Sequence, residues 1–395
     1  MAGFRPSLLT PGAPPRDAGA SSRTVQIMNT LDEIMELAHR DVSGDHVVQN
    51  PRETVFLPGY EFGSDELARK LARQSYQGAW SATELDWDSP FEPDMLVPLR
   101  ERVPRLPRFH PGNSWSVEEW QRYEIANLRY ILSQGLHGEQ LGVIVGGSLC
   151  QAGPTWDVKS FAGWMAVDEA RHAEVFHRYL ERVGGTYAMT DQMYSVIKEV
   201  LEAKEWDKVF VIGQVLIEGL GLGTFGYLLK TVQDPLLVEI LRLSMRDEAR
   251  HVAFGTNQLK SLLGDLTAKE IEERQELVAH CAELLVNRII PVQVAEEFGI
   301  DPRQYVRAVR MSPALREMEM SLFAHIGPIC NRLGLLDANG GKLRRDLETL
   351  GILDIPQGVR DEAEGVLRST VEAAEELYER TGAELPAPLN APPRG

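Results

Sequence analysis

The sequence has few cysteines, a deficit of basic residues and almost no alternating, strand-like hydrophobicity. Its three cysteines, Cys150, Cys281 and Cys330, form no Cys-x-x-Cys metal pattern and suggest no disulfide framework, which points to a reducing cytoplasm. The formal net charge of −17 argues against a nucleic-acid or anionic-membrane binder but allows docking to a basic partner surface. The lack of alternation argues against a mainly β fold.

Long hydrophobic runs are missing as well. The longest, 141–150 and 209–217, reach only about half of the ~20 residues that a membrane-spanning helix needs. The first 22 residues are rich in Pro, Gly, Ala and Ser and lack the continuous apolar core of a signal peptide. We therefore predict no membrane span, a disordered leader at 1–22 and a loose, Pro-rich tail at 383–395.

What is present is a strongly helical pattern with 43% hydrophobic residues, enough for a substantial core. Helical periodicity dominates from about residue 114 onward. Ser116 suits an N-cap, Asp234 precedes a proline at a first helical position, and Thr267 and Glu270 form a capping box. The predicted helices are 24–40, 64–80, 116–151, 157–182, 190–204, 206–231, 235–263, 268–298, 302–333, 341–350 and 359–381.

These elements predict an all-α fold in which four long helices form a bundle with additional N- and C-terminal helices. We expect five regions along the chain. They are the leader at 1–22, an N-terminal helical extension with a Pro- and Arg-rich connector at 23–113, the bundle at 114–264, C-terminal accessory helices at 265–382, and the tail at 383–395.

The five-residue string Asp-Glu-Ala-Arg-His occurs twice in the chain. Each copy holds a Glu and a His three residues apart, Glu169/His172 and Glu248/His251, a spacing that places both side chains on one face of a helix. Carboxylate and imidazole groups are good ligands for iron, manganese or zinc. Two copies indicate two metal ions held between two pairs of helices.

Two further glutamates complete the pattern. A buried metal site in a bundle takes one Glu from each of two helices and a Glu-x-x-His from each of the other two. Glu139 precedes Glu169 by thirty residues and Glu218 precedes Glu248 by thirty, each interval centred on a predicted turn, so each pair should lie level in an antiparallel hairpin. The same three residues recur 79 positions later. The predicted metal ligands are Glu139, Glu169, His172, Glu218, Glu248 and His251.

A solvated helix face is the alternative for these charged residues. Glu218 lies in the run VFVIGQVLIEGLGLGTF, however, and Glu139 directly precedes LGVIVGGSL. A lone carboxylate in such apolar surroundings costs several kcal/mol unless it is paired or bound to a metal. The metal interpretation is therefore the stronger one.

Two other Glu-x-x-His pairs, Glu36/His39 and Glu174/His177, do not pass the same test. The position thirty residues before Glu36 falls in the leader. Glu174 is rotated by about 140° around the helix axis from Glu169, because each residue of a helix turns by ~100°. We interpret both pairs as solvated. Glu124 is a weaker rival of Glu139, because its depth does not match that of Glu169. His137, two residues before Glu139, suits a supporting or core position better than a ligand.

Each motif also carries an Asp and an Arg. A metal-bound His usually donates its free ring N–H to a carboxylate, and Asp168 and Asp247 are the natural acceptors. Arg171 and Arg250 could pair with these aspartates across the bundle. A surface i,i+3 ion pair is the alternative, but its repetition in both copies favours the supporting role.

Four glycines, Gly219, Gly221, Gly223 and Gly226, follow Glu218. Three of them match a dinucleotide-binding fingerprint, but no strand precedes them and no βαβ unit surrounds them. Because glycine weakens a helix by up to ~1 kcal/mol relative to alanine, we expect either a locally distorted helix, with space for a substrate, or tight helix–helix packing.

The order Glu, Glu-x-x-His, Glu, Glu-x-x-His resembles the ferritin-like diiron-carboxylate superfamily over about 114–264. The Asp-Glu-x-Arg-His form of both motifs is most similar to hydroxylase subunits of bacterial diiron monooxygenases and, less closely, to soluble acyl-carrier-protein desaturases. The resemblance implies a ferritin-like four-helix bundle with two iron ions, or a manganese–iron pair, and O2 as co-substrate. It also implies an O2-dependent hydroxylase or desaturase in which the four glutamates serve catalysis.

Two alternatives stay open: an arylamine-type N-oxygenase, and a ferroxidase or iron-handling protein without an organic substrate. An inert scaffold is disfavoured by the repeated ligand set. The arylamine N-oxygenase branch is expected to carry a His where this chain has Ser244. The radical-bearing Tyr of ribonucleotide reductase small subunits is replaced by Phe176, and the Thr that oxygenases and desaturases place after the third Glu is replaced by Gly221 and Leu222.

The expected partners follow from the same comparison. The sequence has no flavin motif and no iron–sulfur cysteine set, so a separate ferredoxin or reductase must supply electrons. The substrate is expected to be a small or acyl-carrier-bound molecule, and the chain to be compatible with a homodimer. The residues expected to line the substrate pocket are Val143, Met165, Phe176, Val215, Leu222 and Phe225, with a position in the helical core as the alternative for each.

Overall fold

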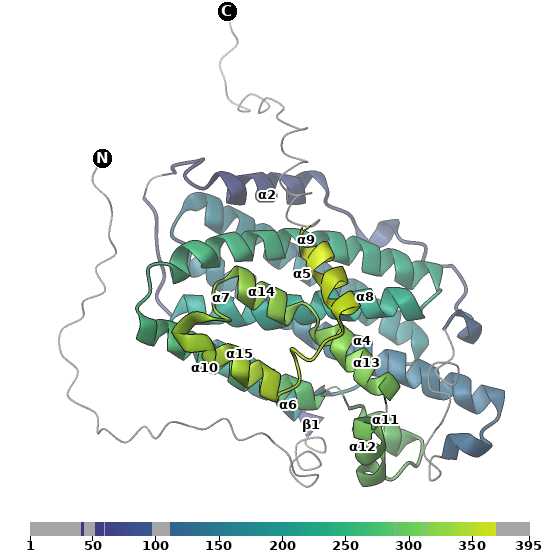
Figure 1. The fold of residues 1–395 in the computed structure, drawn as a ribbon. Helices are drawn as coiled ribbons and strands as arrows, with labels where there is room; N and C mark the ends of the chain where they lie inside the picture. Colours follow the sequence, from purple (N-terminus) through teal and green to yellow (C-terminus); the bar gives the residue numbers. More distant parts are fainter. Residues whose placement is uncertain are drawn as a thin grey trace, which may run out of the picture.

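The structure, a computed structural model of the 395-residue chain, is almost entirely helical (Figure 1). Among the described residues the only strands are β1 (Asp41–Val42) and β2 (Met189–Thr190), which pair antiparallel. The predicted all-α fold is confirmed. The structure describes residues 41–42, 52–58, 60–96, 111–288, 290–311 and 313–368.

Two antiparallel helical hairpins form the central bundle. The first consists of α4 (Val117–Ala152) and α5 (Trp156–Val183), and the second of α8 (Glu218–Thr231) and α9 (Pro235–Leu263). Both turns lie where the sequence predicts them. Figure 1 shows these four helices side by side in the middle of the molecule.

The helix starts that the sequence marks are also formed. The Ser116 hydroxyl accepts from the backbone N–H of Glu119, whose carboxylate accepts from the Ser116 N–H. Asp234 caps α9 by accepting from the Leu237 N–H, and the Thr267–Glu270 capping box is present. Such caps satisfy N–H groups that a helix leaves unpaired at its start.

The predicted helix 206–231 is interrupted rather than continuous. It consists of α7 (Trp206–Ile212), one π-helical turn, η4 (Gly213–Ile217), and α8. A π turn shifts the register of the side chains that follow it, and such turns are frequent at functional sites. The stretch Trp206–Thr231 is long and apolar enough to cross a membrane, but 83% of its most apolar window is buried inside the protein. It is a core helix of the bundle.

Shorter helices surround the bundle. The predicted helix 268–298 is divided near Pro291, and the predicted helix 302–333 is divided near Pro313. Proline cannot continue a helix from the preceding turn, because it lacks the backbone N–H. In Figure 1, α2 lies over α5 and α9 on one side of the bundle, and α13 lies against α8 on another. These helices are α2 (Glu66–Gln77), η1 (Ala82–Glu84), η2 (Pro93–Met95), η3 (Pro111–Ser114), α6 (Asp191–Glu202), α10 (Ala268–Arg288), α11 (Val292–Glu297), α12 (Pro302–Met311), α13 (Pro313–Phe323), α14 (Ile326–Arg332), α15 (Ala338–Thr349) and a last helical segment at 357–368.

Several predicted segments lie outside the described residues. They are the leader, the helix at 24–40, most of the connector at 98–113, the end of the helix at 359–381 and the tail.

The core consists of two main apolar clusters placed one after the other along the bundle. On α5, Phe161 and Met165 belong to one cluster and Phe176 and Tyr179 to the other. On α4, α5 and α9 the predicted metal ligands fall at the transition between the two clusters, whereas Glu218 on α8 has members of the first cluster on both sides. Buried polar groups in this position need partners, which the bundle must supply from its own helices.

Candidate metal centre

The structure brings all six predicted ligands together at the centre of the bundle. Glu139 comes from α4, Glu218 from the start of α8, and one Glu-x-x-His pair from each of α5 and α9. Each side chain is buried, the most exposed being Glu139 at 7%. No residue outside the predicted six belongs to the two groups of candidate ligand atoms found in the described part of the chain.

The six residues form two overlapping groups of four. In each group the candidate ligand atoms all lie within 4.8 Å of one another. Glu169 and Glu248 belong to both groups. Glu139 and His172 complete the first group, and Glu218 and His251 complete the second.

Both imidazoles direct Nδ1 toward the carboxylates. His172 Nδ1 lies 3.4 Å from Glu139 Oε2 and 3.3 Å from Glu248 Oε1, yet it has no hydrogen-bond partner although it is buried. His251 Nδ1 lies 3.1 Å from Glu248 Oε2 and 3.2 Å from Glu169 Oε1. A buried ring nitrogen without a partner among several carboxylates fits a metal-ligating role.

The electrostatics of the centre point the same way. Burial raises the pKa of Glu139 and Glu218 well above the ordinary carboxyl value. Burial also acts to raise the pKa of Glu169 and Glu248, but contacts with the histidines, and for Glu248 also with Glu218, outweigh it and lower both. Without a metal, four carboxylates can be buried together only if protons offset part of their charge, which divalent cations would do directly.

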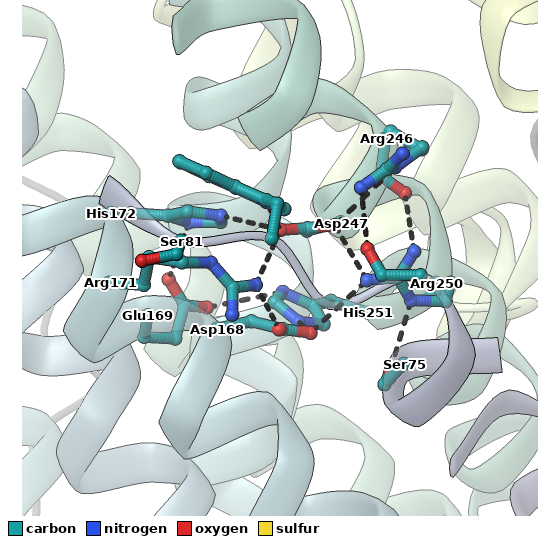
Figure 2. Close-up of polar contacts among 12 residues, drawn as sticks. Ser75, Ser81, Asp168, Glu169, Arg171, His172, Arg246, Asp247, Arg250 and His251 are labelled. Atoms are coloured by element: carbon teal, nitrogen blue, oxygen red, sulfur yellow. Dashed lines mark hydrogen bonds and ion pairs between the residues drawn. The ribbon is translucent and has the colours of Figure 1, made fainter. Parts of the chain in front are cut away.

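The histidines themselves are held by aspartates from the opposite motif. His172 Nε2 lies 3.2 Å from Asp247 Oδ2, and His251 Nε2 lies 3.5 Å from Asp168 Oδ2. Each His thus pairs with the Asp of the other helix, as Figure 2 shows. Burial opposes ionisation of the two aspartates, but contacts with the histidines and Arg250 keep the pKa of each below its ordinary value.

Two arginines close this network in a crossed arrangement. Arg171 pairs with Asp168 on its own helix and, at 2.9 Å, with Asp247 on α9. Arg250 pairs at 2.6 Å with Asp247 on its own helix and at 3.3 Å with Asp168 on α5. The structure therefore places Asp168, Arg171, Asp247 and Arg250 beside the histidines, where the sequence predicts them (Figure 2).

Residues from the N-terminal extension also reach this network, and the sequence analysis missed them. The Trp80 indole N–H donates to Asp247 Oδ2 at 2.7 Å, and the guanidinium carbon of Arg171 lies 4.7 Å from the Trp80 ring centroid. Arg250 Nε donates to the Ser75 hydroxyl at 3.0 Å. No local motif marks either residue, because only the packing of α2 on α5 and α9 brings them here.

Glycines make room for the centre. A Cβ on Gly142 of α4 would lie 2.7 Å from the Glu169 carboxyl carbon. Among the four glycines after Glu218, a Cβ on Gly223 would lie 2.3 Å from the Leu322 carbonyl oxygen, so tight packing against α13 requires glycine at that position. A Cβ on Gly221 would have nothing within 4 Å. The helix distortion precedes Glu218 in η4 instead of following it.

A cavity that is open to solvent reaches the four glutamates between α4 and α8, with α6 and α13 contributing to its walls. Of the six predicted pocket residues, only Phe225 lines it. Met165, Phe176, Val215 and Leu222 are buried in the core clusters instead, and Val143 does not line the cavity either. Helical periodicity identifies buried faces but does not show which of them borders an opening.

The rejected candidates lie away from the centre. Glu174 and His177 are exposed on α5. His137 Nε2 lies 3.1 Å from the Tyr187 carbonyl oxygen, and Glu124 is buried but belongs to neither candidate group. The Glu36/His39 pair lies outside the described residues. Ser244 is buried on α9, four residues before Glu248, and its hydroxyl has no hydrogen-bond partner.

Comparison with known proteins agrees with this geometry. The helical bundle, with its buried Glu and His residues, defines an O2-dependent diiron-carboxylate oxidoreductase of the ferritin-like superfamily. Residues 62–334 match the model of the p-aminobenzoate N-oxygenase AurF family, and the chain belongs to that family. Of the branches considered from the sequence, this is the arylamine N-oxygenase alternative, within the superfamily that the motifs predict.

Similar folds occur among solved structures, and two of them are R2-like ligand-binding oxidases. Both are point variants with an aerobically reconstituted Mn/Fe cofactor. The first is 17% identical, covers 71% of this chain and 99% of its own, and has a TM-score of 0.48. The second is 16% identical, with 69% and 95% covered and a TM-score of 0.46. No curated protein sequence matches the chain.

Proposed function

We propose that this protein holds two iron ions at the six-residue centre and uses O2 to oxygenate the nitrogen of an arylamine. The two groups of four candidate ligands that share Glu169 and Glu248 carry the metal assignment. The family match supports nitrogen as the atom that is oxygenated. Hydroxylation or desaturation of carbon is the alternative outcome for the same centre.

Each side chain has a defined role in this proposal. Glu139 and His172 would hold one ion and Glu218 and His251 the other, and Glu169 and Glu248, which belong to both groups, would contribute to holding both. Two divalent ions offset the charge of four ionised glutamates, and the histidines bind as neutral imidazoles held by Asp247 and Asp168. The same donors suit a manganese–iron pair, which metal analysis would identify.

The bound iron pair would supply O2 activation, and the protein would position the substrate beside it. The step ArNH2 + O2 + 2 e− + 2 H+ → ArNHOH + H2O balances when a separate donor provides the two electrons. We propose a ferredoxin or reductase for that role, because the sequence contains neither a flavin motif nor an iron–sulfur cysteine set. The substrate would be a small molecule.

Three further points belong to this proposal. We place the catalytic bundle at 114–264, with the N-terminal extension and the C-terminal helices as accessory regions. The described structure has three free cysteines, which suits a reducing cytoplasm. A homodimer would be compatible with these assignments.

The first experiment measures metal content and product together. The protein, expressed with iron, should contain close to two metal ions per chain and, with a reductant and ¹⁸O2, should transfer one labelled oxygen to an arylamine. Glu248→Ala should lose both properties. Glu174→Ala is the matched control, because Glu174 also lies in a Glu-x-x-His pair on α5 but is exposed.

The outcomes separate the candidate functions. Labelled product supports N-oxygenation, and labelled alcohol would redirect the proposal to carbon hydroxylation. Iron oxidation by O2 with no organic product would support an iron-handling protein instead. Absence of bound metal in the unmodified protein would refute the assignment of the centre.

A further inference from the structure

Exposed apolar side chains gather on the face of the bundle that α2 covers. Tyr76, at the end of α2, is 68% exposed, and Val167 on α5 is 49% exposed. The Tyr76 ring packs edge-on against Trp164, one turn before Val167, at a centroid distance of 5.7 Å. These three residues form what we call the α2–α5 patch. Large exposed apolar side chains that lie together are typical of a contact site for another molecule.

Positive charge lies beside this patch, although the chain as a whole is acidic. Arg69 and Arg73 precede Tyr76 by seven and three residues on α2, so the three side chains share one side of that helix. In total α2 carries three basic residues and a single acidic residue, which are Arg69, Lys70, Arg73 and Glu66. The net charge of the whole chain is −17. This local excess of positive charge would attract a partner with an acidic surface.

The segment that follows α2 connects the patch to the metal centre. The Trp80 indole N–H donates to Asp247 Oδ2 at 2.7 Å, and the same oxygen lies 3.2 Å from His172 Nε2. The Trp80 ring is nearly parallel to the His172 ring, with 6.4 Å between centroids and 23° between planes. Trp80 is half-buried and lies over Arg171, one turn after Val167 on α5. It therefore links the surface to a predicted metal ligand through one carboxylate oxygen.

The proposed reaction needs two electrons from a separate protein. The rate of electron transfer falls steeply with the distance between donor and acceptor, so the donor must dock near the metal ligands. The cavity lies between α4 and α8, whereas α2 packs on α5 and α9. A protein bound over the α2–α5 patch would therefore approach the centre from the side of the histidines and leave the cavity free for the substrate.

We propose that the α2–α5 patch is the docking site of an acidic one-electron carrier protein, whose electrons enter at Trp80. This inference rests on the proposed oxygenase function and names the partner that reduces the same centre. In each of two transfers one reduced carrier is oxidised and one ferric ion is reduced to the ferrous ion, by way of Trp80, Asp247 and His172. Exposed acidic side chains lie further along α5, from Glu174 onward, and limit the contact to the side of α2.

Binding of an acidic 2Fe–2S ferredoxin tests the docking site without turnover. The iron-loaded protein should bind it at about 20 mM salt and at least tenfold more weakly at about 300 mM, because salt screens exposed charges. Val167→Glu should weaken binding at least tenfold, whereas Val167→Lys should not weaken it. Val117→Glu is the matched control, because Val117 is 50% exposed but lies about 33 Å along α4 from Glu139, at 1.5 Å per residue.

Three results would overturn the docking site. They are the absence of ferredoxin binding, equal weakening by Val167→Glu and Val117→Glu, and equal binding of the Val167→Glu and Val167→Lys variants. Sedimentation of the protein alone tests the other occupant, a second copy of this chain. A dimer that Val167→Glu dissociates would assign the patch to that second copy and would also overturn the proposal.

Rapid mixing tests Trp80 as the point of entry, in samples with equal iron content. Trp80→Phe should bind ferredoxin as tightly as the unmodified protein, but its ferric centre should be reduced by bound ferredoxin at least tenfold more slowly. Dithionite, a small reductant, should reduce both proteins at the same rate. An unchanged rate with ferredoxin, or equal slowing with dithionite, would show that electrons do not enter at Trp80.

A chemical reductant separates this proposal from the broader one. If dithionite supports formation of the oxygenated product while the ferredoxin tests fail, the docking site is wrong and the proposed function stands. If the unmodified protein holds no iron, or forms no product with any reductant, the proposed function fails whatever the partner.

Discussion

The two helical hairpins carry the same ligands 79 residues apart, but their surroundings differ. His172 is backed by Asp247, which also accepts the Trp80 indole N–H. His251 is backed by Asp168 at a longer distance, 3.5 Å, and within the described part of the chain no tryptophan donates to that carboxylate. The repeated sequence therefore supplies the same ligands to both hairpins. The segment after α2 makes their surroundings unequal, because its Trp80 donates to Asp247 and not to Asp168.

A second difference concerns the space about one helical turn before Glu139 in the first hairpin and before Glu218 in the second. Gly135 on α4 opens onto the cavity, while the position 79 residues later is Gln214 in η4, which is buried and whose amide has no hydrogen-bond partner. Gln214 fits only because Gly255 faces it: a Cβ there would lie 1.6 Å from the Gln214 Oε1. The position one turn before Glu139 is open to the cavity, whereas the corresponding position before Glu218 is filled by a buried side chain.

The largest expected effect distinguishes the two glutamates that belong to both ligand groups from the two that belong to one group only. Glu169→Ala or Glu248→Ala should reduce bound iron to near zero, because each residue belongs to both ligand groups. Glu139→Ala and Glu218→Ala should each retain about one ion, since each removes a ligand from one group only. Equal metal loss in all four variants, measured by elemental analysis, would contradict a two-ion centre with shared ligands.

Metal binding should weaken as the pH falls. Without metal, Glu139 and Glu218 have raised pKa values because of burial, and those of His172 and His251 are raised because their carboxylate contacts outweigh burial. Protons on these groups compete with a bound metal, so the apparent metal affinity should fall as the pH is lowered from 7 to 6. Competition with a chelator measures the slope, and a flat profile would contradict this account.

The two aspartates should differ in effect. Asp247→Asn and Asp168→Asn should each lower iron affinity, by roughly 10–100-fold, because each removes the carboxylate that orients a histidine. The loss should be larger for Asp247→Asn, since Asp247 makes the shorter contact with its histidine and holds Trp80. Trp80→Phe should reproduce only a small part of that loss. A larger effect of Asp168→Asn in chelator titrations would reverse the ranking of the two halves.

The smallest expected effect concerns packing. Gly255→Ala should lower the free energy of unfolding of the metal-free protein by about 1–3 kcal/mol, because the added carbon displaces the buried Gln214 side chain. Gly135→Ala should instead raise it by up to ~1 kcal/mol, since the site is open and alanine favours helix. Chemical denaturation compares the two, and equal effects would show that the two hairpins are packed alike.

Much of the centre could be predicted from sequence because its signals are local and repeated. Glu-x-x-His spacing, thirty-residue intervals and the turns at their midpoints determine which residues share a face and a height. Of the six residues expected at the pocket only Phe225 lines the cavity, and Met165, Phe176, Val215 and Leu222 take the core position that was the alternative, since both positions satisfy the same periodicity. The predicted long helices 268–298 and 302–333 were divided, and Ser75 and Trp80 were missed.

The sequence by itself determined the all-helical fold, the two hairpins and the six residues that meet at the centre, since helix periodicity and mirror-related spacing depend only on position along the chain. The tertiary structure alone decided that each His is held by the Asp of the other hairpin, that Trp80 covers one half, and that the cavity opens between α4 and α8. These features depend on how helices distant in sequence pack together, and no local pattern encodes the side on which two packed helices leave a space.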